Sequence, residues 1–203
     1  MKIIIHRVNK IDKLTKIPRK FGLEIDVRGY GNDLYLNHEP IDEPEKYDKL
    51  EDFLALCHGR FIVFNLKEAG YENLVIDLAK KYNISDYFLL DVEFPYLYRA
   101  TREDKFKKIA VRYSEAEPIQ NVRKQIKDNK PLVNWVWIDT NTSLPLNPRI
   151  IKDLILFKTC LVCPERWGRA NDIASYIKKM KKINFKPDAI MTSFECASEW
   201  EKF

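Results

Sequence analysis

The sequence predicts an α/β protein, a single compact (β/α)8 TIM barrel over residues 1–203 with a small hairpin extension after its second strand. Short apolar runs rich in β-branched residues alternate with amphipathic helical stretches along the whole chain. Several of these runs are apolar nearly throughout, as the strands of a helix-covered parallel sheet are. No linker rich in Pro, Gly or Ser interrupts the alternation, so we expect one domain.

Eight runs are typical of barrel strands. In chain order they are Lys2–His6, Leu23–Val27, Phe61–Lys67, Tyr87–Val92, Lys108–Tyr113, Leu132–Ile138, Cys160–Cys163 and Ala189–Phe194. Helices are predicted at Glu72–Tyr82, Ile119–Lys127, Pro148–Phe157 and Asn171–Lys182, where Pro148 and Asn171 suit helix starts. The segment Asp33–His38 follows a turn rich in Gly, so we expect it to form a hairpin with the second strand.

Composition narrows the class of protein. Hydrophobic residues make up 45% and charged residues 32% of the chain, which is ordinary for a globular protein. The net charge of +5 is scattered, and its densest patch, Lys178–Lys182, has the spacing of a solvated helix face, so a nucleic-acid partner is disfavoured. No apolar stretch approaches the length of a membrane span or of a secretory signal, so we expect a cytoplasmic location.

The cysteines do not indicate a metal or redox site. Cys160 and Cys163 have the spacing of a zinc-binding pair, but no second pair completes such a site. Their odd separation within a predicted strand places the two thiols on opposite faces. We therefore expect both to be small buried apolar residues.

Polar side chains with catalytic potential accompany the first two predicted strands. His6 ends the first run, and His38 ends the hairpin extension. Glu24 and Asp26 are separated by one residue, so on a strand both carboxylates point to the same face. Imidazole groups transfer protons near neutral pH, and co-facing carboxylates hold hard cations. This combination predicts a site that cleaves phosphodiesters.

Further candidates lie at the ends of the first, third, fourth and fifth predicted strands, where the functional groups of a (β/α)8 barrel gather. They are Arg7, Asn65, Lys67, Asp91 and Arg112. A structural ion-pair cluster of Glu24 and Asp26 with Arg28 and Lys67 is the alternative to a site. Asp91 and Arg112 are equally compatible with a structural pair and with substrate contacts. His58 precedes the third strand and is interpreted as a loop residue at the opposite face.

Four segments within residues 1–68 resemble the glycerophosphodiester phosphodiesterases of the phospholipase-C-like phosphodiesterase superfamily. They are Ile4-Ile5-His6-Arg7, Leu23-Glu24-Ile25-Asp26-Val27, Leu34-Tyr35-Leu36-Asn37-His38-Glu39-Pro40 and Phe64-Asn65-Leu66-Lys67, in the family's order and approximate spacing. The resemblance implies a TIM barrel, with the catalytic histidines at His6 and His38 and metal-binding carboxylates at Glu24 and Asp26. It also implies phosphate contacts from Arg7 and Lys67.

The chain departs from this family pattern at three places. Val8 stands where the family has Gly, and Lys10–Phe21 lacks the family's Pro-Glu-Asn segment. Asn65 replaces the glutamate that is the third metal ligand. An amide oxygen ligates Mg²⁺ or Ca²⁺ without carrying charge, so we expect weaker metal binding unless Asp91 supplies a carboxylate.

The sequence therefore predicts a metal-assisted hydrolase of a small-molecule phosphodiester, a divergent relative of that family. Mg²⁺ or Ca²⁺ would be held by Glu24, Asp26 and Asn65, with His6 and His38 as the general acid–base pair. The alternative is a non-catalytic or weakly active barrel that binds phosphorylated ligands without a metal. The roles within the histidine pair, the alcohols that flank the phosphate and the oligomeric state stay open.

Overall fold

The computed structural model describes residues 1–203, which divide into two compact units. The N-terminal unit is Ile4–Tyr96, and the C-terminal unit is Leu97–Phe203 together with Met1–Ile3. No helix in either unit combines the length and the apolar character needed to cross a bilayer.

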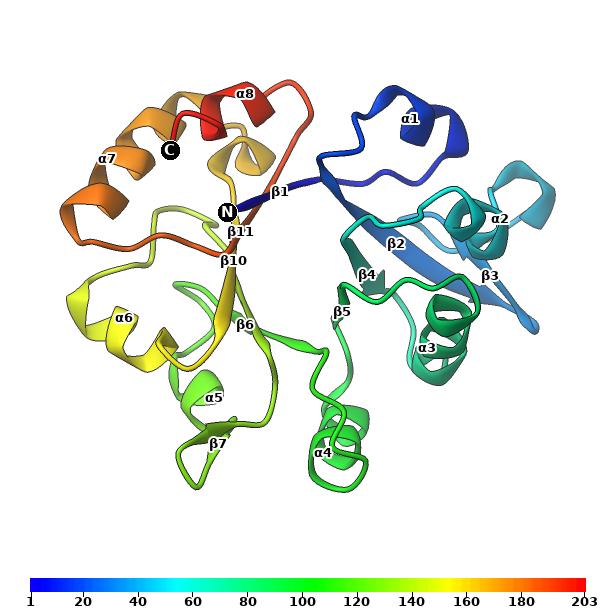
Figure 1. The fold of residues 1–203 in the computed structure, drawn as a ribbon, viewed down its shortest axis with the longest axis horizontal. Coiled ribbons are helices and arrows are strands. Elements are labelled where there is room, and N and C mark those ends of the chain that lie inside the picture. The colour runs from blue at the N-terminus through cyan, green and yellow to red at the C-terminus, as the bar shows by residue number, and fades with distance from the viewer. The chain divides into compact units, whose positions relative to one another are not determined.

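In the N-terminal unit, helices and parallel strands alternate (Figure 1). The elements are β1 (Lys2–Ile5), whose first two residues belong to the C-terminal unit, then α1 (Ile11–Lys16), β2 (Gly22–Tyr30), β3 (Asp33–Leu36), α2 (Leu50–Ala55), β4 (Ile62–Leu66), α3 (Glu72–Lys81) and β5 (Tyr87–Leu90). The parallel strands are ordered β5-β4-β2-β1, and β3 pairs with β2 in the antiparallel sense. This antiparallel pair is the hairpin extension that the sequence predicts.

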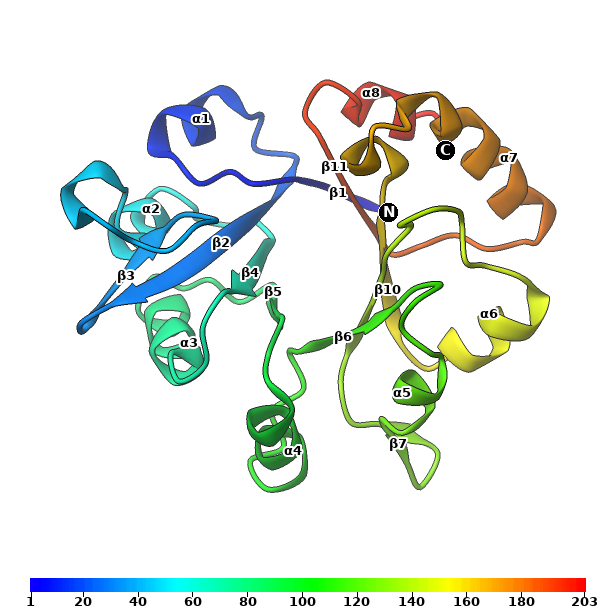
Figure 2. The ribbon, with the colours of Figure 1, turned by 180° about the vertical axis from the view of Figure 1, so that it is seen from behind.

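The C-terminal unit repeats the alternation (Figure 2). Its elements are α4 (Phe94–Arg102), which begins before the unit boundary, then β6 (Ala110–Tyr113), α5 (Gln120–Arg123), β7 (Ile126–Lys127), β8 (Lys130–Pro131), β9 (Trp135–Ile138), α6 (Pro148–Leu154), β10 (Lys158–Val162), α7 (Ile173–Lys182), β11 (Ala189–Thr192) and α8 (Ala197–Trp200). Its parallel strands are ordered β11-β10-β9-β6.

Each of the eight predicted strand runs overlaps a parallel strand, and the fold is of the (β/α)8 class. The strands are apolar because both faces are covered: β4, β5, β9 and β11 are buried at every residue. Cys160 and Cys163 are free and buried, as the sequence predicts. The assignment of 1–203 to one domain stays a prediction.

The prediction of one helix over Ile119–Lys127 is wrong. Helix α5 ends at Arg123, and Ile126–Lys127 pairs with Lys130–Pro131 as a two-stranded hairpin. The two residues between these strands, Asp128 and Asn129, have φ values of 51° and 58°. Positive φ at both central residues is the conformation of a tight hairpin turn, which Asp and Asn tolerate. The turn chemistry therefore outweighs the helical spacing of the apolar residues.

Of the two predicted helix starts, Pro148 is confirmed as the first residue of α6, and Asn171 lies two residues before the start of α7. Asn147, one residue before Pro148, accepts hydrogen bonds from the N–H groups of Arg149 and Ile150 and is the N-cap of α6. Helix α7 begins at Ile173, after a short 3-10 turn that contains Asn171.

Candidate functional site

The candidate site lies at the carboxyl ends of β1, β2 and β4, all within the N-terminal unit. His6 directly follows β1, and Lys67 directly follows β4. The parallel register aligns Asp26 on β2 with Asn65 on β4, so their side chains share a face of the sheet with Glu24. The sheet register thus brings Glu24 and Asn65 together, although they are 41 positions apart in the sequence.

Asp26 is fully buried and is held as a carboxylate. Its Oδ1 lies 2.9 Å from Nζ of Lys67, and its Oδ2 accepts a 2.9 Å hydrogen bond from Nδ2 of Asn9. Asn9 also accepts a 2.9 Å hydrogen bond from the backbone N–H of Asp26. Burial acts to raise the pKa of Asp26, but the hydrogen bonds from Asn9 and Lys67 outweigh it and lower the pKa.

Glu24, two residues earlier on the same face, is in a different electrostatic state. Its Oε1 accepts a 2.8 Å hydrogen bond from Nδ2 of Asn65, and its Oε2 accepts one of 2.8 Å from the backbone N–H of Arg7. Burial, and then the negative charge of Asp26, raise the pKa of Glu24 from its ordinary value of 4.5 to about 7. Near neutral pH the pair therefore holds one carboxylate and one group that exchanges a proton.

The two histidines lie beside different carboxylates. Nε2 of His6 is 3.8 Å from Oε2 of Glu24, and Nδ1 of His38 is 3.3 Å from Oδ1 of Asp26. Nη2 of Arg7 lies 3.0 Å from Nε2 of His38. A guanidinium group only donates hydrogen bonds, so Nε2 of His38 is the acceptor and carries no proton in this arrangement.

Local backbone structure orients these groups. Arg7 has a φ of 50°, an uncommon value for a residue other than Gly, and this conformation coincides with its N–H donating to Glu24. Arg28 donates two hydrogen bonds, of 3.2 and 2.8 Å, to the carbonyl oxygen of His38. Arg28 is itself fixed by an ion pair with Glu68 at 2.9 Å. Arg28 is therefore a positioning residue for His38.

Sequence reasoning missed two members of the site. Asn9 lies in the loop after β1, where no periodicity marks it. The sequence predicts Arg28 only as a counter-ion of Glu24 and Asp26, whereas its ion pair is with Glu68. The alternating pattern of β2 does place Arg28 on the face of Asp26, and this was the available signal.

Two further candidates from the sequence, Asp91 and Arg112, lie on or directly after later strands. Asp91 follows β5, is exposed and has a φ of 60°. Nowhere in the structure are three His, Cys, Asp or Glu side chains grouped so that they could hold a metal ion. Arg112 belongs to the C-terminal unit, where its Nη1 lies 2.5 Å from Oδ2 of Asp139. Val8, at the family's Gly position, is completely buried.

The oxygen donors of the cluster suit a hard cation in their chemistry. Glu24 and Asp26 provide carboxylates, and Oδ1 of Asn65 is buried without a hydrogen-bond partner. An unsatisfied buried acceptor next to two carboxylates is a place where a divalent ion would be stabilised. Lys67 already balances the charge of Asp26, so it competes with such an ion for Oδ1 of Asp26.

A pH-dependent stability follows from the pKa of Glu24. In metal-free buffer with EDTA, the folded protein binds more protons than the unfolded chain between pH 4.5 and about 7, so Glu24 makes the free energy of unfolding fall as the pH rises through this window. We expect Glu24→Gln to gain stability relative to the wild type over the same window. Urea unfolding of both proteins across the window checks this, with the exposed Glu45→Gln as the control. Parallel stability curves for wild type and Glu24→Gln would contradict it.

Comparisons with known proteins identify the fold. No protein-family model matches the chain, and no curated protein matches it in sequence. The structure of a glycerophosphodiester phosphodiesterase from Agrobacterium tumefaciens aligns with a TM-score of 0.67 at 13% identity, covering 94% of this chain and 96% of that chain. A glycerophosphoryl diester phosphodiesterase from Parabacteroides distasonis aligns with a TM-score of 0.63 at 12% identity, covering 99% of this chain and 86% of that chain. The (β/α)8 fold predicted from the sequence is therefore confirmed, and in that fold the chain is similar to glycerophosphodiester phosphodiesterases of known structure.

Proposed function

We propose that this protein hydrolyses small-molecule phosphodiesters of the glycerophosphodiester class. The observation that carries the proposal is the placement of two imidazole groups, each within 4 Å of a different carboxylate of the pair on β2. Both enzymes of similar fold are phosphodiesterases by name, which supports the same reaction class here. Assaying glycerophosphodiesters and other phosphodiesters for release of a phosphate monoester, with Mg²⁺ and with Ca²⁺, tests the proposal.

His38 is the general base in this proposal and His6 the general acid. Nε2 of His38 is unprotonated while it accepts from Arg7, and it is free to take a proton once Arg7 turns to the substrate phosphate. His6 lies beside Glu24, whose raised pKa makes its carboxyl a proton source near neutral pH.

In the reaction, the oxygen of an attacking hydroxyl group or water bonds to phosphorus. His38 takes the proton of that hydroxyl group or water. The bond from phosphorus to the leaving oxygen breaks, and His6 gives that oxygen a proton. Arg7 and Lys67 stabilise the negative charge on the non-bridging phosphate oxygens. Asp26 keeps His38 and Lys67 in place through contacts of 3.3 and 2.9 Å.

A divalent cation, if bound, would be held by Glu24, Asp26 and Asn65. It would supply Lewis-acid neutralisation of the phosphate oxygens. The side chains of Arg7 and Lys67 are also positively charged, so they too neutralise the charge of the phosphate oxygens.

The alternative function, binding of phosphorylated ligands without cleavage, is favoured by one observation. Lys67 forms an ion pair with Asp26, and the third oxygen ligand available to a metal, that of Asn65, is an uncharged amide. The negative charge of Asp26 is therefore already neutralised without a metal ion. Melting temperatures measured with EDTA, with Mg²⁺ and with Ca²⁺ distinguish metal-assisted hydrolysis from metal-free ligand binding. A metal that binds only the native state raises the melting temperature, and we expect this rise only for the hydrolase.

Asn65→Glu tests the metal site directly. A third carboxylate increases the attraction for a dication, so we expect Mg²⁺ or Ca²⁺ to bind about tenfold or more tightly than in the wild type, as ligand charge count tunes affinity over such ranges. Titration calorimetry measures the change, and Asn65→Gln is the control because it keeps an amide. If neither wild type nor Asn65→Glu binds a divalent ion at millimolar concentration in the presence of a phosphodiester, the metal mechanism is wrong.

A further inference from the structure

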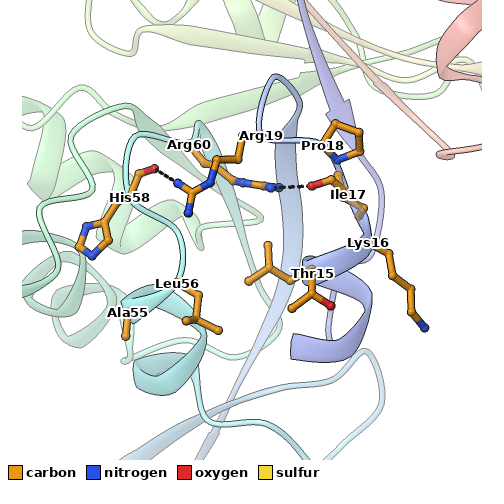
Figure 3. Close-up of a pocket in the computed structure, with 10 residues that line it drawn as sticks. Thr15, Lys16, Ile17, Pro18, Arg19, Ala55, Leu56, His58 and Arg60 are labelled. Atoms are coloured by element: carbon orange, nitrogen blue, oxygen red, sulfur yellow. Dashed lines mark hydrogen bonds between the residues drawn. The ribbon is translucent and has the colours of Figure 1, made fainter.

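A pocket lies at the amino-terminal ends of β2 and β4, away from the carboxyl ends that carry the candidate site (Figure 3). It has a volume of about 680 Å³ and is contained in the N-terminal unit. Helix α1 and the segment after it form one wall, and the end of α2 with the loop before β4 forms the other. A cavity of this size is in the range of small-molecule sites.

The lining of this pocket is cationic and apolar, with no acidic residue. Its charged members are Lys16, Arg19 and Arg60, and His58 also lines it. Its other members are Leu14, Thr15, Ile17, Pro18, Ala55 and Leu56. An oxyanion with an apolar body matches this combination in both charge and polarity.

Arg60 is the central feature of the pocket. The residue is only 7% exposed, and one of its nitrogens, Nη2, donates a 2.6 Å hydrogen bond to the carbonyl oxygen of Ile17. Its Nε and Nη1 are buried and have no hydrogen-bond partner. Buried N–H donors of a guanidinium group normally have acceptors, because leaving them unpaired is costly. The hydrogen bond to Ile17 fixes the position of the Arg60 side chain, but it provides an acceptor for only one of the three guanidinium nitrogens.

A second guanidinium approaches the first. Nη1 of Arg19 donates to the carbonyl oxygen of His58 at 3.4 Å, and Figure 3 shows the Arg19 and Arg60 side chains between the two walls. Neither arginine has a carboxylate partner. Burial lowers the pKa of Arg60, Cys57 acts to raise it, and the neighbouring charge of Arg19 lowers it. Two like charges without a counter-ion are stabilised when an anion binds between them.

We propose that this pocket binds a phosphate monoester, with its phosphate between Arg60 and Arg19 and its apolar body against Leu56 and Ile17. A dianion balances two guanidinium groups, and phosphate oxygens are acceptors suited to arginine. The site is independent of the proposed function, because its residues are separate from those of the candidate site.

Titration calorimetry with phenyl phosphate tests this proposal. We expect binding to the wild type, and at least tenfold weaker binding to Arg60→Met, a change of about 1.4 kcal/mol. Leu56→Glu places a negative charge at the mouth of the pocket and should weaken binding by a similar factor. Leu56 is 46% exposed, so this variant tests the pocket without disturbing the core, even if Arg60→Met does not fold.

Two controls locate the bound anion. Tyr30→Glu adds the same charge at an exposed residue of the same unit, 49% accessible and at the carboxyl end of β2, and should leave binding unchanged. Arg7→Met removes a cation of the candidate site and should also leave this binding unchanged. The proposal is overturned if phenyl phosphate does not bind the wild type, if Leu56→Glu binds it as the wild type does, or if only Arg7→Met abolishes binding. Equal affinity for benzoate would overturn the phosphate assignment.

Discussion

Replacing either His6 or His38 with Ala is expected to lower the turnover of a phosphodiester by about 10²-fold or more, because positioned acid–base catalysis contributes roughly that much. The wild type should show a bell-shaped dependence of rate on pH, since one imidazole must be protonated and the other not. Each variant should lose one limb of that profile. Initial rates between pH 5 and pH 9, measured with saturating substrate, check both expectations.

His58→Ala is the matched control for these two variants. It removes the remaining histidine of the chain, which is exposed in the loop before β4 and lies at the opposite ends of the strands. Its turnover should equal that of the wild type. Near-normal turnover in His6→Ala or in His38→Ala would exclude that histidine from the mechanism.

Lys67→Met is expected to have the largest effect on stability. Lys67 is 13% exposed and lies 2.9 Å from a carboxylate oxygen of Asp26, which is completely buried. Removing one partner of a buried ion pair leaves an uncompensated charge and typically lowers the free energy of unfolding by about 3–5 kcal/mol. Catalysis should also fall, since a cation near the phosphate is lost. Urea unfolding at pH 7 measures the stability change.

The exposed pair of Lys80 and Asp77 provides the comparison for Lys67→Met. Its side chains are 72% and 69% exposed at a separation of 3.1 Å, so Lys80→Met should leave stability almost unchanged. Equal, small effects of Lys67→Met and Lys80→Met would mean that the Lys67–Asp26 pair is not the element that stabilises the candidate site.

The strands were predictable because burial on both faces imposes apolar, β-branched sequences on them, as in Ile62–Leu66. The short helices were not. Helix α1 has one buried residue, Leu14, and α2 is six residues long, so neither carries enough periodic signal to be recognised. At Asp128 and Asn129 the preference of Asp and Asn for a tight hairpin turn outweighs the helical spacing of the neighbouring apolar residues.

The cluster at the strand ends was predictable for a different reason. Alternation along β2 places Glu24 and Asp26 on one face, and the register of parallel strands brings Asn65 and Lys67 to the same face. What alternation cannot encode is the partner of each group. Asn9 binds Asp26 from an irregular loop, and only the three-dimensional course of that loop reveals the contact.

The buried guanidinium of Arg60 was beyond sequence reasoning as well. A basic residue in a loop before a strand is ordinarily solvated. Here the path of the chain after α1 covers it, and the carbonyl oxygen of Ile17 accepts one of its N–H groups. The cationic pocket is therefore a property of loop packing rather than of a sequence motif.

The most direct test of the central claim is phosphorus NMR of a glycerophosphodiester incubated with the wild type and with the His6→Ala/His38→Ala double variant, in Mg²⁺ and in Ca²⁺. The account predicts that the wild type converts the diester signal into that of a phosphate monoester, directly or through a cyclic phosphate. It also predicts that the double variant leaves the diester intact. An unchanged diester with the wild type under both metals, or equal conversion by the double variant, would contradict the account.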